Sequence, residues 1–99
     1  MISEFLERHL STPFPVGAKD IHVLNADLEM LDADVVGLAE SYLEHGRLTA
    51  EQRTILEGCV ADLRQVVREL PEGMRDFFAR LHALGVAVLN RLPVRGPAA

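Results

Sequence analysis

Pro71 divides the C-terminal half of the sequence into two long segments with helical periodicity. The first segment begins at Thr49, which with Gln52 three residues later has the spacing of a capping box. Its apolar residues recur at steps of three and four, as one face of a helix requires: Leu56, Cys59, Val60, Leu63, Val66, Val67 and Leu70. Proline has no amide hydrogen and disfavours helical geometry in the residue before it. The sequence therefore predicts a helix over 50–70.

The second segment predicts a helix over 74–91, which Pro93 ends. Its apolar face is wide and consists of Phe77, Phe78, Leu81, Leu84, Val88, Leu89 and Leu92. The sequence "PEG" at 71–73 predicts a tight turn between the two helices. Helices joined by so short a turn pack as an antiparallel hairpin. We therefore predict an all-α fold, a small helical bundle around an antiparallel hairpin of 50–70 and 74–91.

The N-terminal half starts with a predicted helix over residues 2–10, whose inward residues would be Ile2, Phe5, Leu6 and Leu10. Residues 20–31 permit two interpretations. Apolar residues from Ile21 to Tyr42 repeat as a heptad seam, which favours one continuous helix. Alternatively, "IHVL" and "DLEML" form a short β-hairpin at 21–30 around Asn25 and Ala26, and Asp32 caps a helix over 33–45. In either case Gly46 is a typical residue to close this helix.

Chain length and composition limit the domain organisation. The sequence has 99 residues, of which 48% are hydrophobic, and this is about the size of one compact domain. We predict a single helical domain at 1–92 and a disordered tail at 93–99. Glu4 and Glu7 stand where a secretory signal would be basic, and the purest apolar run, "LGVAVL" at 84–89, is too short to span a bilayer. We expect a cytoplasmic protein with no membrane association.

The net charge of −5 is distributed unevenly along the chain. Residues 1–49 contain nine acidic residues against three basic ones, a balance of −6, whereas residues 50–99 contain six acidic residues against seven arginines, a balance of +1. Nucleic-acid backbones are bound by clustered cations. We therefore expect no direct binding to nucleic acid.

The sequence offers no pattern for a metal site, a cofactor or an active site. A calcium-binding loop needs oxygen ligands at positions 1, 3, 5 and 12 and a glycine at position 6, and neither Asp32 nor Asn25 starts such a series. Glu-x-x-His and His-x-x-x-His pairs are absent from the chain. Cys59 lies on the apolar stripe of its helix, which predicts an unreactive core thiol, and its solitary occurrence rules out an intramolecular disulfide. We expect neither a cofactor nor enzymatic activity.

The remaining feature is acidic surface. We predict an acidic binding face, which would contact a protein partner of basic character, at Asp27, Glu29, Asp34, Glu40 and Glu44. In composition and helix content the chain is similar to the small acidic helical proteins that bacteria use as inhibitors, immunity proteins or adaptors. The alternative hypothesis is a homodimeric helical bundle that senses a small apolar ligand or a metal. Self-association would use apolar surface that one bundle cannot bury.

Overall fold

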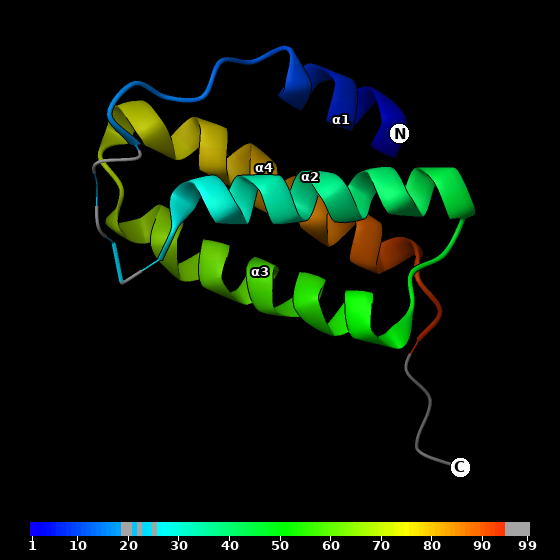
Figure 1. Cartoon of the computed structure of the whole chain (residues 1–99). Coiled ribbons are helices and arrows are strands. Elements are labelled where there is room, and N and C mark those ends of the chain that lie inside the picture. Colours follow the sequence, from blue (N-terminus) through cyan, green and yellow to red (C-terminus); the bar gives the residue numbers. More distant parts are fainter. Residues whose placement is uncertain (19–20, 22, 25, 95–99) are drawn as a thin grey trace.

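The computed structural model describes residues 1–18, 21, 23–24 and 26–94. They form four helices: α1 (Ile2–Leu10), α2 (Leu28–His45), α3 (Ala50–Glu69) and α4 (Glu72–Arg91). No β-strand occurs among the described residues. Helices α2, α3 and α4 pack against one another, and α1 packs against α2 and α4 (Figure 1). The predicted all-α fold, a small helical bundle, is confirmed.

Local signals fix both ends of α3. Thr49 and Gln52 form the predicted capping box, in which Gln52 N donates to Thr49 Oγ1 at 3.0 Å and Thr49 N donates to Gln52 Oε1 at 2.9 Å. The helix ends at Glu69, before the extended backbone of Leu70. The prediction of a turn at "PEG" is wrong, because Glu72 and Gly73 already belong to α4 and Pro71 alone occupies its N-cap position. After this short connection α4 runs back along α3 (Figure 1).

Helix α2 begins earlier than the hairpin interpretation predicts. Asp27 is its N-cap, and the side-chain Oδ1 accepts from the amide of Met30 at 3.0 Å. The prediction that Asp32 caps this helix is therefore wrong, and so is a continuous helix from Ile21. In the segment between Ile21 and Asp27, Val23 and Ala26 form one isolated antiparallel bridge. The predicted hairpin also involves His22 and Asn25, which lie outside the described residues.

The C-terminal ends of α2 and α4 agree with the sequence signals. Gly46 closes α2 with a φ of 72°, the left-handed geometry that glycine adopts without strain. Helix α4 ends at Arg91, two residues before Pro93. The carbonyl oxygen of Pro93 accepts a hydrogen bond from Nη1 of Arg53 on α3. Residues 95–99 of the predicted tail lie outside the described residues, so the tail and the 1–92 domain stay predictions.

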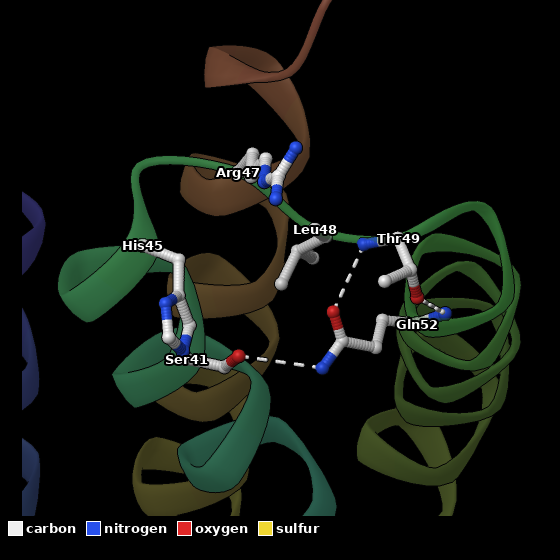
Figure 2. A pocket seen from close by; sticks show the side chains of 6 residues that line it. All are labelled: Ser41, His45, Arg47, Leu48, Thr49 and Gln52. Carbon is white, nitrogen blue, oxygen red and sulfur yellow. Dashed lines mark hydrogen bonds between the residues drawn. The ribbon is translucent and has the colours of Figure 1, made fainter.

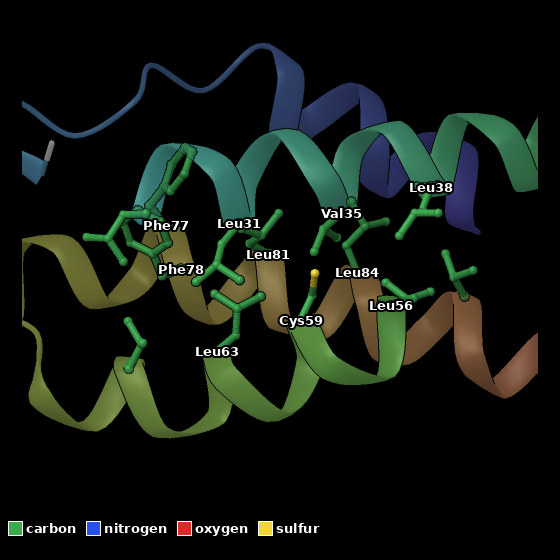
Figure 3. Close-up of a cluster of buried hydrophobic side chains, with 14 of the residues drawn as sticks. Leu31, Val35, Leu38, Leu56, Cys59, Leu63, Phe77, Phe78, Leu81 and Leu84 are labelled. Carbon is green, nitrogen blue, oxygen red and sulfur yellow. The ribbon is translucent and has the colours of Figure 1, made fainter. Parts of the chain in front are cut away.

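The core lies where α2, α3 and α4 face one another (Figure 3). It contains Leu31, Val35 and Leu38 from α2, Leu56, Cys59 and Leu63 from α3, and Phe77, Phe78, Leu81 and Leu84 from α4. Gly85 is also buried, and a Cβ atom added there would lie 2.7 Å from Cγ2 of Val60 and 3.8 Å from Cγ1 of Val35. The absence of a side chain at Gly85 therefore sets how closely α4 approaches its neighbours.

Helix α1 closes one side of this core through Ile2, Leu6 and His9. The prediction that Leu10 faces inward is wrong, since its side chain is 57% exposed. The buried histidine stacks on Phe77 with ring centroids 4.7 Å apart, and its Nε2 lies 2.5 Å from Oδ1 of Asp32. Asp32 thus connects α2 to α1 instead of starting α2.

Candidate protein-binding groove

An open hollow of about 350 Å³ lies between α2 and α3, and we call it the α2–α3 groove. It is lined by Ala26, Asp27, Met30, Leu31, Asp34, Ile55, Gly58, Cys59 and Asp62. The floor is apolar, because Leu31 and Cys59 belong to the buried core. Three carboxylates stand around that floor. The groove therefore combines an apolar surface with concentrated negative charge.

Helix α2 supplies one wall through residues at helical spacing. Asp27, Met30, Leu31 and Asp34 are three, four and seven residues apart, so they lie along one side of the helix. Met30 is 55% exposed although it is a large apolar side chain. The Asp27 carboxylate is partly committed to capping α2. Asp34 makes no ion pair with any residue that the structure describes, so its charge is available to a ligand.

Helix α3 supplies the opposite wall through Ile55, Gly58, Cys59 and Asp62, again at helical spacing. Ile55 is 46% exposed. A Cβ atom added at Gly58 would meet no heavy atom within 4 Å, so packing within the protein does not require glycine there. Glycine in the middle of a helix costs about 0.5–1 kcal/mol relative to alanine. At this position its effect is to leave the groove wall open to a close approach by another backbone.

The carboxylates of the groove affect the pKa of the Cys59 thiol on its floor. Burial raises the pKa of Cys59 above its ordinary value, and the carboxylates of Asp34 and Asp62 raise it further. The thiol is therefore protonated at neutral pH and is a poor nucleophile. Asp34 and Asp62 come from opposite walls and act on the same thiol, so their negative potentials overlap at Cys59.

The five residues of the predicted acidic face do not lie together. Asp27 and Asp34 line the α2–α3 groove. Glu29 and Glu40 are about 140° away from them around α2 at 3.6 residues per turn, and Glu29 lines a separate hollow beside Phe14. Glu44 is exposed near the end of the helix. The structure thus brings two of the five together.

Asp62 is the site residue that the sequence did not single out. It lies on α3, 28 residues after Asp34, and reaches the same groove only because the two helices pack side by side. In the sequence it is an acidic residue in a helix with mixed charges. Its position beside the apolar stripe of this helix is the local signal in the sequence for a role at an interface.

A second hollow, of about 390 Å³, lies at the junction of α2 and α3 and is shown in Figure 2. It is lined by Ser41, His45, Arg47, Leu48, Thr49 and Gln52. Three of its polar residues bind one another, because Gln52 accepts from the Thr49 amide and donates from Nε2 to Ser41 Oγ at 3.3 Å. These hydrogen bonds belong to the start of α3, and the lining of this hollow has none of the acidic side chains that surround the α2–α3 groove.

Metal centres and membrane-spanning helices are both absent among the described residues. Within that part of the chain, no group of three or more histidine, cysteine, aspartate or glutamate side chains is arranged to hold a metal ion. None of the helices described is long and apolar enough to cross a membrane. The imidazole of His9 is paired with Asp32 beneath α1 and does not face the groove.

Comparison with known proteins gives no assignment: no family model, curated protein or solved structure matches this chain. The groove itself therefore carries the functional inference.

Proposed function

We propose that the protein is a non-catalytic, cytoplasmic protein-binding module of the inhibitor, immunity or adaptor type. It binds a basic amphipathic helix of its partner in the α2–α3 groove and thereby covers that surface of the partner. The observation that carries the proposal is the placement of Asp27, Asp34 and Asp62 around the exposed apolar side chains of Met30 and Ile55.

The apolar part of the groove suits helical side chains. An amphipathic helix binds in a groove by inserting apolar residues three, four and seven positions apart. Met30 and Ile55 stand on opposite walls, and methionine adapts its shape to different apolar partners. A volume of about 350 Å³ accommodates one or two such anchoring side chains. Gly58 leaves room for the backbone of the bound helix.

The charged part of the groove selects the partner. Lysine or arginine side chains next to the apolar anchors would approach the three carboxylates, while acidic segments would be repelled. Charge complementarity of this kind accelerates encounter and weakens as salt is added. A basic segment is therefore the expected ligand.

Peptide binding tests this proposal. The probe is a fluorescein-labelled amphipathic helix with leucines at positions i, i+4 and i+7 and lysines flanking them, and the matched control replaces each lysine by glutamate. Fluorescence anisotropy should show binding of the lysine peptide only, with an affinity that falls between low and physiological ionic strength. Affinity that does not change with salt would contradict the proposal.

Two pairs of substitutions locate the binding surface. D34N/D62N should weaken lysine-peptide binding about tenfold, because each exposed charge pair contributes about 0.5–1 kcal/mol. E40Q/E44Q removes the same charge from α2 residues outside the groove and should leave affinity unchanged. Equal losses in both variants would show a general charge effect instead of a groove. Affinity capture from the source cells, with D34N/D62N as the control bait, then identifies the natural partner by mass spectrometry.

The sensor hypothesis receives less support from the same surface. The α2–α3 groove is open and rimmed by charge, whereas sites for small apolar ligands are enclosed and largely apolar.

A further inference from the structure

The end of the α2–α3 groove adjoins a surface of opposite charge. This surface, which we call the arginine shelf, is formed by Leu24, Arg64, Gln65, Arg68 and Glu69 around an open hollow. A third hollow between the two is lined by Leu24, Ala26, Asp62, Gln65 and Val66. It shares Ala26 and Asp62 with the groove, and Leu24 and Gln65 with the shelf. The acidic and the basic surfaces are therefore continuous.

Leu24 projects from the shelf under backbone strain. Its φ is 53°, which makes it the one non-glycine residue with positive φ in the described part of the chain. This conformation costs a residue such as leucine about 1–2 kcal/mol. The side chain is nevertheless 59% exposed, so burial within the protein does not compensate the strain. An exposed apolar side chain held in this way is suited to insertion into another surface.

The arginines of the shelf are free to make intermolecular contacts. Arg64 and Arg68 are exposed on α3, and neither makes an ion pair with a described residue. Arg64 also contributes to a lowered pKa of His82 on α4, which places its charge near that helix. The single acidic side chain that lines the hollow of the shelf is Glu69.

We propose that the arginine shelf of one copy occupies the α2–α3 groove of a second copy, so that the protein forms a two-fold dimer that masks its own binding site. A surface with adjacent acidic and basic halves is complementary to itself when rotated by 180° about their boundary. In such a dimer Leu24 enters the partner copy's groove. Arg64 and Arg68 start about 160° and about 120° around α3 from Asp62, and their long side chains reach past Leu24 toward Asp34 and Asp62 of the other copy. The groove and the arginine shelf of each copy both contribute to the interface, as an isologous interface requires.

This inference rests on the proposed function, because it assigns to the groove an occupant that the basic helix must displace. It makes binding dependent on protein concentration: the apparent affinity for a partner falls as the concentration of the protein rises, since more grooves are occupied by other copies. The dimer would thus store the protein in a masked form.

Charge reversal with complementation tests the dimer. Sedimentation velocity of the wild-type chain over a range of concentrations should show a species of twice the 10.9 kDa mass of one chain. D34K/D62K makes both halves basic and R64E/R68E makes both acidic, so each variant alone should sediment as a monomer. Mixed in equal amounts, the two variants should form a heterodimer, because the basic surface of one then faces the acidic surface of the other.

Leu24→Ser tests the apolar contact separately. It should weaken the wild-type dimer by about tenfold or more, the effect of removing one buried apolar anchor at an interface. Circular dichroism verifies that each variant is folded. If a reversed variant fails to fold, the neutral pairs D34N/D62N and R64Q/R68Q replace it, and each should weaken the dimer.

Three results would overturn the dimer: a wild-type chain that is monomeric at all concentrations, a dimer that persists in both reversed variants, or mixed variants that do not associate. The lysine peptide separates this inference from the proposed function. R64E/R68E keeps the groove intact and unmasked, so it should bind the peptide at least as tightly as the wild type. If the lysine peptide binds but the wild type forms no dimer, the dimer hypothesis alone is rejected. If the wild type forms a dimer but R64E/R68E does not bind the peptide, the proposed function is rejected.

Discussion

Replacement of Gly85 by alanine should destabilise the protein, although alanine favours helices. Alanine in the interior of a helix is about 1 kcal/mol more favourable than glycine. At Gly85, however, the added Cβ atom would lie 2.7 Å from Cγ2 of Val60 and 3.6 Å from Cδ1 of Leu56. Carbon atoms in favourable contact are about 3.5–4.0 Å apart, so one of the two helices must shift or Val60 must leave its rotamer.

The size of this effect follows from the two opposing contributions. Overpacking a well-packed core costs about 1–3 kcal/mol, and Val60 relaxes poorly because a β-branched side chain in a helix has one strongly preferred rotamer. After subtraction of the gain in helix propensity, G85A should lower the free energy of unfolding by up to about 2 kcal/mol. This corresponds to about 4–8 °C in Tm for each kcal/mol in a domain of this size.

Gly37 provides the matched control, because it also lies within a helix and an added Cβ atom would meet nothing within 4 Å. G37A should raise stability by about 0.5–1 kcal/mol. Thermal and urea unfolding should therefore move in opposite directions for the two glycine-to-alanine changes. In a double-mutant cycle, V60A should relieve the defect of G85A. A stabilising G85A, or a defect that V60A leaves unchanged, would refute the packing explanation.

Three further predictions concern single contacts. D32A leaves buried His9 Nε2 without its partner and should cost about 1–3 kcal/mol in urea unfolding, whereas D32N retains an acceptor and should cost less. T49A removes the capping oxygen of α3 and should cost about 1 kcal/mol, while T49S should be close to wild type. Burial and, to a smaller extent, Arg64 lower the pKa of His82 below its ordinary 6.5. As pH falls through 6.5, the unfolded chain therefore takes up a proton before the folded chain does. The free energy of unfolding should decline over this pH range. R64M should raise the His82 pKa in an NMR titration and reduce this decline; an unchanged titration would exclude Arg64 as a cause.

The parts of the fold that the sequence predicts correctly depend on residues that are close together in the sequence. The capping box of Thr49 and Gln52 and the left-handed Gly46 each act within one helical turn, so a single sequence shows them. The residue at which α2 begins depends also on tertiary packing. Asp27 and Asp32 are both good capping residues, and the choice is made by packing, which buries Leu28 and Leu31 in the core.

Residues whose role depends on a distant partner were missed. His9 is buried by Phe77 and paired with Asp32, 68 and 23 residues away, and the periodicity of α1 alone could not prefer it over Leu10. The acidic face was predicted from a run of acidic residues without knowledge of helix rotation. The groove instead takes Asp62 from α3, because sites between helices are defined by packing and not by order in the sequence.

The shortness of α1 has a consequence for folding. Its nine residues are fewer than the about 12–15 that an isolated helix needs in water. The helix therefore exists because Ile2, Leu6 and His9 are docked on the bundle, and undocking and melting are one event for this segment. Amide hydrogen exchange in α1 would then measure how often the helix leaves α2 and α4. Comparing this exchange between the wild type and D32A would report the contribution of the contact between His9 and Asp32, from residues that do not line the groove.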